Sequence, residues 1–412
     1  MSRRIDRREF LTGALALAAA GVAARPLGGL LGSAAGAAED AASKSSTGRK
    51  LVLCTLYGGN DGLNMVVPFE DPAYYDARSN IAVDANTLLP LSDGLGLNPV
   101  VPGFKKLWDA GRLAIVRGVG YPDASLSHFQ GMAIWQTASP SGDVGTGWLG
   151  RWLDMTRGDS LRACSVGPIV LPAMSGEKTQ AAAVQDSTSG SAQLPDASHD
   201  VLAIYRQLQG HRPGAGSSVN EIATSGRAML STARKFATAL DREPPPVLPE
   251  GVDDGDIGTQ LDIVSSLIRG GVPTQAYAVT QNGYDTHSGE VSTQTQLLGQ
   301  LDTAITAFFG SLAGYPQAEG TTLLIHTEFG RRVDSNGSDG TDHGTANNVL
   351  VIGPSVTGGF YGDQPSLTKL DENGNLRFEI DFRSVYATVL EHVIGIDSRS
   401  ILDKRYPLIG FI

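Results

Sequence analysis

The chain has 412 residues, a formal net charge of −11 and two cysteines. This acidic balance excludes partners that need a basic surface, such as nucleic acid and anionic lipid. The cysteine count excludes a fold built on disulfides. Cys54 lies inside an apolar run and is predicted to be a buried small side chain rather than a reactive thiol.

The first 37 residues have the parts of an export signal. Arg7–Leu11 (RREFL) precedes an apolar stretch, as in a twin-arginine (Tat) signal, and Ala35–Ala37 is a predicted cleavage site. Arg25 keeps the stretch below the ~20 residues that a membrane span needs. We therefore expect export in the folded state through the Tat translocon, removal of the signal, a periplasmic or secreted protein, and no stable membrane span.

After a flexible linker over 38–49, residues 50–412 are predicted to form one domain with strands and helices in alternation. Apolar runs predict buried strands at Lys50–Tyr57, Leu113–Val119, Ala276–Thr280, Thr321–Thr327 and Val349–Ile352. Amphipathic stretches predict helices at Pro102–Gly111, His128–Ala138, Val219–Leu240, Ile257–Ile268, Gln296–Ala313 and Asp381–Gly395. This order predicts an α/β protein, a three-layer α/β/α sandwich with a mainly parallel central sheet. The polar stretch 175–220 is expected to be a loop-rich insertion.

Four polar clusters follow predicted strands: Gly58–Asn64, Asp285–His287, Thr327–Arg332 and Gly340–Gly344. In an open parallel sheet, ligands bind beyond the carboxyl ends of the strands, so clusters far apart in sequence are expected to meet at one edge. Taken singly, each cluster also fits an ordinary turn or hydrogen-bonded loop. The prediction of a single site therefore depends on the position that all four clusters share, directly after predicted strands.

Carboxylates and neutral imidazoles in such clusters are typical metal ligands. Two ions about 4 Å apart can clamp the attacking and leaving oxygens of a displacement at phosphorus or sulfur. We expect one or two divalent ions, Zn²⁺, Mn²⁺, Mg²⁺ or Ca²⁺. The predicted ligands are Asp61, Asp285, His287, Glu328, Asp342 and His343.

The segment Tyr121–Phe129 leads into a predicted helix and offers hydroxyl groups. Ser127 or Ser125 would lie at the helix N-terminus, where free backbone N–H groups attract an anion and a nearby metal activates a nucleophile. The alternative is an ordinary N-cap serine. One of the arginines after Glu328 would either fork onto a phosphate or sulfate or pair with surface acids. The predicted catalytic residues are Ser125, Ser127, His128 and Arg331.

Several motifs together resemble the DUF1501 family of Tat-exported bacterial proteins, a distant relative of the alkaline phosphatase and sulfatase superfamily. They are Leu56–Asn64, Leu126–Phe129, Gly147–Arg151, Asp285–His287, Thr327–Arg331, Gly340–Gly344 and Asp381–Arg383, which span nearly the whole mature chain. The resemblance implies an alkaline phosphatase-like fold and metal-dependent hydrolysis of phosphate or sulfate esters, in small molecules or polymers.

The same resemblance implies roles for particular residues. Asp61 would be the acidic ligand after the first strand, and Ser127 or Ser125 the nucleophile. The Asp285–His287 and Asp342–His343 pairs would be the later ligand sets.

The chain also departs from the superfamily pattern. It lacks the Cys-x-Pro-Ser-Arg motif of formylglycine sulfatases, and Glu328 stands at a strand end where the superfamily has an Asp-His pair. Two functions therefore remain open, the metal-dependent hydrolase and a non-catalytic descendant that binds or assembles with a second exported protein. No glycine fingerprint for a dinucleotide and no cysteine ligand set is present, so we set an oxidoreductase aside.

Overall fold

The computed structural model describes residues 48–412 apart from 143, 157–158, 168, 185–234, 237, 241 and 244–252. The predicted signal over 1–37, nearly all of the linker, most of the predicted helix Val219–Leu240 and residues 185–220 of the predicted insertion lie outside the described residues. No helix within these described ranges is both long and apolar enough to cross a bilayer.

The apolar runs form one central sheet, with strand order β13-β5-β12-β9-β1-β8-β6-β7 and β14 beside β5. Its strands are β1 (Arg49–Tyr57), β5 (Leu113–Gly120), β6 (Ala163–Val166), β7 (Ala182–Val184), β8 (Ala276–Asn282), β9 (Gly320–His326), β12 (Asn347–Ile352), β13 (Gly359–Tyr361) and β14 (Ile380–Asp381). Neighbouring strands run parallel, except that β12 is antiparallel to both β5 and β9. The prediction of a mainly parallel sheet is thus confirmed, and all five predicted strands are present. Within the predicted insertion 175–220, Ala182–Val184 form β7 and pair with β6.

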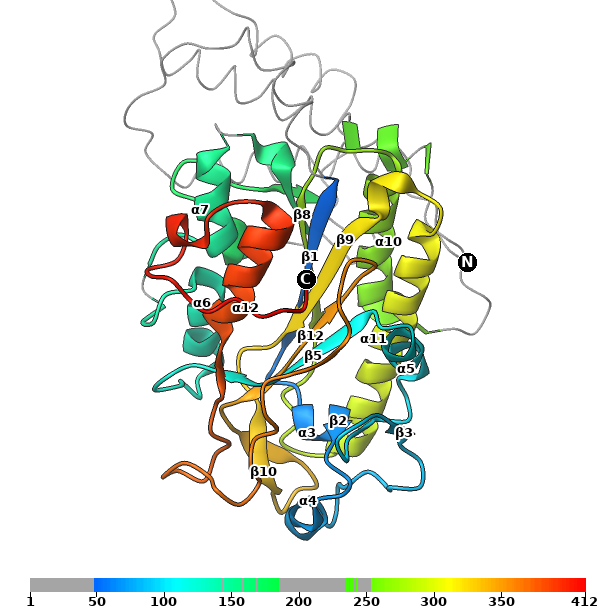
Figure 1. Ribbon diagram of the computed structural model, residues 1–412, viewed down its shortest axis with the longest axis vertical. Helices are drawn as coiled ribbons and strands as arrows, with labels where there is room; N and C mark the ends of the chain where they lie inside the picture. Colours follow the sequence, from blue (N-terminus) through cyan, green and yellow to red (C-terminus); the bar gives the residue numbers. More distant parts are fainter. Residues whose placement is uncertain are drawn as a thin grey trace, which may run out of the picture.

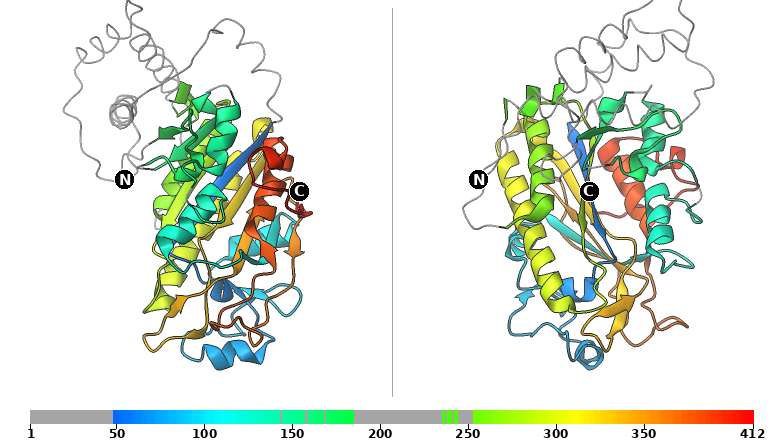
Figure 2. Two further views of the ribbon diagram at one scale, coloured as in Figure 1. Left: turned by 90° about the vertical axis from the view of Figure 1, so that its left-hand side faces the viewer. Right: turned by 180° about the vertical axis from the view of Figure 1, so that it is seen from behind.

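Helices cover both faces of this sheet (Figures 1 and 2). One layer contains α5 (Pro102–Asp109), α10 (Gly255–Arg269) and α11 (Glu290–Leu312); the other contains α6 (His128–Thr137), α7 (Trp148–Met155) and α12 (Phe382–Val389), which continues as a π-helix over Leu390–Ile394. Successive residues of β1 alternate between the layers, since Val52 and Cys54 join one apolar core and Leu51 and Leu53 the other. The three-layer α/β/α sandwich is therefore confirmed. Cys54 is buried and free, as predicted, and its burial raises its pKa to about 12.

Small elements gather at the end of the sheet where the parallel strands terminate, at the bottom of Figure 1. They are α3 (Gly62–Met65), α4 (Pro72–Ala77), the hairpin β10–β11 (Arg331–Ser335 and Thr341–His343) and a small sheet of β2 (Val66–Val67), β3 (Leu89–Pro90) and β4 (Gly96–Leu97). Because β12 runs against its neighbours, it starts at this same edge. The hairpin β10–β11, which connects β9 to β12, therefore lies beside the loops that follow β1, β5 and β8.

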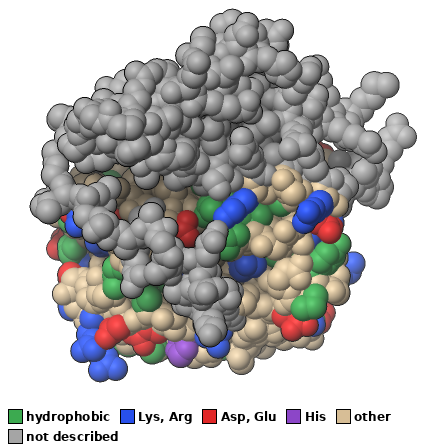
Figure 3. Space-filling model, turned by 90° about the horizontal axis from the view of Figure 1, so that it is seen from above, with side chains coloured by type: hydrophobic (Ala, Val, Ile, Leu, Met, Phe, Trp, Pro, Cys, Tyr) green, Lys and Arg blue, Asp and Glu red, His purple; other side chains and the backbone are tan. Residues whose placement is uncertain are grey.

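Figure 3 views the molecule from the opposite end. Where the described residues form that surface, Lys and Arg side chains are interspersed with Asp, Glu and apolar side chains.

Two glycines let the loop after β1 pack closely against the neighbouring loops. Gly58 has φ +117°, and a Cβ atom on it would lie 2.4 Å from the backbone nitrogen of Asp285. Gly59 has φ +71°, and a Cβ there would meet the Phe329 ring at 2.6 Å. Both the left-handed backbone and the lack of space require glycine. The close approach brings the end of β1 against the segment that carries Asp285.

Replacing Gly58 by alanine should lower the free energy of unfolding by about 2–4 kcal/mol, because the added methyl group forces the two loops apart. Gly299→Ala is the matched control. Gly299 lies in α11 with no atom near its missing Cβ, so alanine there should stabilise the protein by about 0.5–1 kcal/mol. Urea unfolding of both variants measures the difference; equal stabilities would contradict the steric argument.

Candidate metal centre

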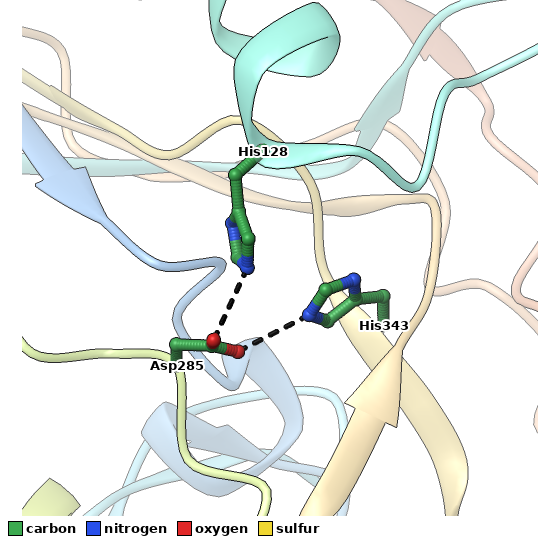
Figure 4. A group of neighbouring side chains, drawn as sticks. All are labelled: His128, Asp285 and His343. Atoms are coloured by element: carbon green, nitrogen blue, oxygen red, sulfur yellow. Dashed lines mark hydrogen bonds and ion pairs between the residues drawn. The ribbon is translucent and has the colours of Figure 1, made fainter.

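Three side chains from distant segments converge at the edge of the sheet (Figure 4). His128 is the first residue of α6, Asp285 lies in the loop after β8, and His343 ends β11. Each offers one ligand atom, and the three atoms lie within 4.8 Å of one another. The Nε2 atom of His343 is 3.1 Å from Oδ1 of Asp285, and Nε2 of His128 is 3.3 Å from Oδ2. Asp285 and His343 belong to two of the four clusters that were predicted to meet, and His128 belongs to the segment Tyr121–Phe129.

His287 extends this group to a fourth side chain. Its Nε2 atom lies 3.1 Å from Oδ1 of Asp285 and 2.9 Å from Nε2 of His343. We refer to His128, Asp285, His287 and His343 as the His3Asp cluster. Three imidazole nitrogens and one carboxylate are a donor set that suits Zn²⁺ and similar ions.

The hydrogen-bond partners favour one tautomer for each imidazole in the cluster. The Nδ1 atom of every ring faces an oxygen that can accept a hydrogen bond, and a ring with its hydrogen on Nδ1 would keep a lone pair on Nε2. The three contacts are His128 Nδ1 to Glu328 Oε1 at 2.8 Å, His287 Nδ1 to Asp342 Oδ1 at 3.1 Å and His343 Nδ1 to the Leu126 carbonyl at 2.8 Å.

In these tautomers, three lone pairs and a carboxylate would face one another. The Nε2 atom of His128 is buried, and although Asp285 lies at ion-pair distance, the angle is not that of a hydrogen bond. The Nε2 atoms of His287 and His343 lie 2.9 Å apart, and in these tautomers neither would have a hydrogen to donate. Acceptors packed in this way repel one another unless a cation lies among them, so the cluster has the chemistry of a metal site.

Arg331 lies on the buried side of the cluster and contacts Asp285. Its buried guanidinium donates to Oδ1 of Asp285 at 2.8 Å and to the carbonyls of Gly58, Gly59, Tyr284 and Thr341. The expectation of a substrate anion as its partner is therefore corrected. The buried donors of Arg331 are used on backbone carbonyls and on the half-exposed carboxylate of Asp285, with which it forms an ion pair.

This arrangement also sets the ionisation of Asp285. Partial burial raises the pKa of its carboxyl, but the hydrogen bond from the Arg331 guanidinium and the nearby imidazoles outweigh that effect and lower the pKa to about 2. The carboxylate is therefore charged at neutral pH and available as a ligand.

Glu328 and Asp342 lie behind the imidazoles rather than among the ligand atoms. Glu328 is buried and also accepts from the Gly58 N–H at 2.9 Å and the Thr327 hydroxyl at 2.9 Å. The pKa of Asp342 is lowered chiefly by its hydrogen bond with His287. Carboxylates in such positions orient metal-binding histidines and raise their basicity. We therefore move both from the predicted ligand set to the residues that position it.

Asp61 has a different set of partners. It is fully buried, caps α3 by accepting from the Leu63 N–H at 3.1 Å, and forms an ion pair with the buried guanidinium of Arg78. Burial favours a raised pKa for Asp61, but Arg78 more than offsets this and the pKa is lowered. Because both oxygens are engaged in that pair, we leave Asp61 out of the ligand set.

The two predicted serines lie at the start of α6. Ser127 is the N-cap residue directly before His128, yet its exposed hydroxyl makes no capping hydrogen bond. The hydroxyl of Ser125 instead accepts from the Ser127 N–H at 3.2 Å. Ser127 thus has the helix-terminal position expected from the sequence, with its hydroxyl free of the capping role.

Phe329 and Leu126 were missed as contributors from the sequence alone. The buried Phe329 ring packs beneath His128 and His343, with ring centroids 4.9 and 4.8 Å apart. Leu126 contributes only its carbonyl oxygen to His343. For Phe329, the available sequence signal was its position beside the neighbouring motif residues. A contact made by a backbone carbonyl, as at Leu126, leaves no signal in the sequence.

Arg331→Lys should lower the free energy of unfolding by about 3 kcal/mol, because a lysine ammonium cannot reach the five acceptors that the guanidinium joins. Arg332→Lys is the matched control on the next residue, whose side chain is partly exposed, and should change stability by less than about 0.5 kcal/mol. Urea denaturation measures both. Equal losses in the two variants would contradict the role assigned to Arg331.

Comparison with known proteins places these observations in a family. A comparison with curated protein sequences found no match. Among solved structures, the chain is similar to an alkaline phosphatase superfamily protein from Vibrio parahaemolyticus (TM-score 0.38, 10% identity, 86% of this chain and 66% of that chain). It is also similar to the lipoteichoic acid synthase LtaP from Listeria monocytogenes (0.36, 10%, 86% and 74%) and to a mutant of TAB5 alkaline phosphatase with Mg bound (0.34, 8%, 76% and 94%).

These structural likenesses are too weak to assign an activity. The family model described as "Protein of unknown function (DUF1501)" matches residues 115–405, which is well over half of the chain. The family predicted from the motifs is thus confirmed: the chain belongs to the DUF1501 family.

Proposed function

We propose that this protein is an exported metal-dependent hydrolase of phosphate or sulfate esters, with its metal ion held by the His3Asp cluster. The observation that carries the proposal is the meeting of three Nε2 lone pairs with the Asp285 carboxylate. A single proton relieves the repulsion of only one pair of acceptors. One divalent ion would relieve the repulsion among several of them at once, and the ligand atoms of His128, Asp285 and His343 lie within 4.8 Å of one another.

The donor set favours Zn²⁺ among the ions expected from the sequence. Imidazole nitrogen suits Zn²⁺, whereas Mg²⁺ and Ca²⁺ prefer all-oxygen sites. The described residues support one ion rather than two, because Asp61, Glu328 and Asp342 are engaged elsewhere.

The cluster is accessible to a substrate. The side chains of Asp285 and His287 are 47% and 45% exposed, and catalytic zinc sites keep a position open in this way. When bound there, Zn²⁺ would lower the pKa of a water molecule and polarise an ester oxygen. The substrate class rests on the family resemblance, whereas the metal rests on the contacts.

In this proposal, different residues of the chain orient the ligands, keep Asp285 ionised and attack the substrate. Glu328 and Asp342 keep the hydrogen on Nδ1 of His128 and His287, and Arg331 keeps Asp285 ionised. Ser127, with its exposed hydroxyl beside His128, is the proposed nucleophile. Ser127→Ala should then abolish turnover while leaving the metal content unchanged.

Metal content is the direct test. Protein exported by its own signal and purified without chelator should contain about one equivalent of zinc by elemental analysis. His343→Ala and His287→Ala should lose most of it, because each removes a ligand. His392→Ala is the matched control, since His392 lies in the π-helix after α12 and outside the cluster. Wild-type protein that stays metal-free when offered Zn²⁺ or Mn²⁺ would contradict the proposal.

Hydrolysis of p-nitrophenyl phosphate and p-nitrophenyl sulfate tests the reaction class. Wild-type protein should turn over at least one of them, and His343→Ala should reduce kcat/KM at least about 100-fold. A protein that binds zinc without turning over either ester would favour the alternative function, a binding or assembly partner of a second exported protein. Co-purification after export would then identify that partner.

Glu328→Ala should weaken zinc binding about 10–100-fold although it removes no ligand, because His128 loses the acceptor that fixes its tautomer. The control is Glu319→Ala at an exposed position after α11. Competition with a chromophoric zinc chelator measures both affinities. Unchanged affinity in Glu328→Ala would show that the carboxylate does not orient the ligand.

A further inference from the structure

A second cluster of buried polar groups lies next to the His3Asp cluster, and neither proposed catalysis nor metal binding uses it. Glu290 is the first residue of α11 and is fully buried. Its Oε2 atom accepts from the Thr341 hydroxyl at 2.5 Å, and Oε1 accepts from the Asn64 amide at 3.4 Å. Its carboxyl neighbours that of Asp61, because Asn64 bonds both to Glu290 and to the Arg78 guanidinium that pairs with Asp61.

Arg78 is the one cation among these groups. Its guanidinium is fully buried, pairs with Asp61, and donates to the carbonyl of Arg332 at 2.7 Å and of Val333 at 2.9 Å. Arg78, at the end of α4, therefore links strand β10 to the loop after β1 by hydrogen bonds and an ion pair.

The charges do not balance unless a proton is present. Asp61 and Glu290 are two carboxyl groups in contact, buried beside a single guanidinium, so only one of them can be ionised at little cost. A proton between the two oxygens makes the cluster neutral and supplies the hydrogen that joins them. Arg78 stabilises the ionised form of Asp61 directly, which leaves the proton on Glu290.

The other groups that face Glu290 do not supply a second positive charge. Thr341 from the hairpin and Asn64 from α3 are neutral. Tyr74 from α4 donates to Asn64 at 2.7 Å, and burial raises the pKa of this tyrosine, so it stays neutral too. For Glu290, burial and the neighbouring Asp61 raise the pKa to about 9.

The position of these bonds ties them to the proposed metal centre. Thr341 directly precedes Asp342 and His343, and its N–H donates to the Thr286 carbonyl, between Asp285 and His287. Glu290 therefore joins the start of α11 to the hairpin at the point where two ligand-bearing segments meet.

We propose that Glu290 is a positioning residue for the His3Asp cluster. It shares one proton with Asp61, which keeps the group formed with Arg78 neutral. This group holds the hairpin β10–β11 against the loop that carries Asp285 and His287. The inference rests on the proposed metal function. Its consequence is a pH limit. When the shared proton is lost, two buried carboxylates face one guanidinium and the hairpin is released.

The sign of the effect on folding follows from the direction of the shift. A carboxyl whose pKa is higher in the folded state contributes stability that is complete below its unfolded pKa, near 4.5, and is lost as pH rises toward about 9. Glu290→Gln has nearly the same shape and carries its hydrogens at every pH. Between pH 5 and 9, the folding equilibrium constant of the wild type should therefore fall, relative to that of Glu290→Gln, by up to about tenfold per pH unit.

Two measurements on the full chain test the inference. Urea unfolding of wild type, Glu290→Gln and the exposed control Glu319→Gln, at pH 5, 7 and 9, should show the relative loss for wild type against Glu290→Gln, with Glu319→Gln following wild type. Zinc affinity, by chelator competition, should be equal in all three proteins at pH 7. At pH 10 it should fall at least about tenfold further in wild type and Glu319→Gln than in Glu290→Gln.

Parallel pH dependence of unfolding in wild type and Glu290→Gln would overturn the shared proton. A fall in zinc affinity between pH 7 and pH 10 that is equal in wild type and Glu290→Gln would overturn the positioning role. Wild-type protein that binds no zinc at pH 7 would contradict the proposed function instead, and the unfolding comparison would still decide whether the proton is shared.

Discussion

The arrangement of this molecule's functional end depends on one buried guanidinium. Arg331 has to satisfy its donors without water, and it does so on carbonyls of the loops after β1 and β8, on the Thr341 carbonyl in β11 and on the Asp285 carboxylate. Burying an unpaired guanidinium would be very costly, so these loops are held around it. The side chains of His287 and His343, which come from the same segments, are thereby brought together, with 2.9 Å between their Nε2 atoms.

The antiparallel strand β12 is the second constraint. In a fully parallel sheet, the chain would leave β9 at one edge and begin the next strand at the other. Here β12 starts where β9 ends, so the hairpin β10–β11 fits between them and its pairing places Arg331 opposite His343. Residues directly opposite on paired strands share a face, and both side chains accordingly reach Asp285.

Much of the fold was predictable because strands buried on both faces leave long apolar runs, as in β1 and β9, and because strand ends in a parallel sheet share one edge. The roles of the individual acidic residues were not predictable from the sequence. Asp61, Asp285, Glu328 and Asp342 all follow strands or lie in the adjoining hairpin, yet one pairs with Arg78, one faces the cluster and two orient imidazoles. These roles depend on partners far away in sequence: Arg78 lies at the end of a short helix without a clear apolar period, and His343 is fixed by a backbone carbonyl.

The central claim is that His128, His287, His343 and Asp285 surround one ion. X-ray absorption at the zinc edge, on protein loaded with one equivalent of zinc, tests it most directly. The account predicts a first shell of nitrogen and oxygen at about 2.0–2.2 Å, with outer-shell scattering from three imidazole rings that falls to two in His287→Ala. Scattering from fewer than three imidazoles in the wild type, or a pattern unchanged in His287→Ala, would contradict it.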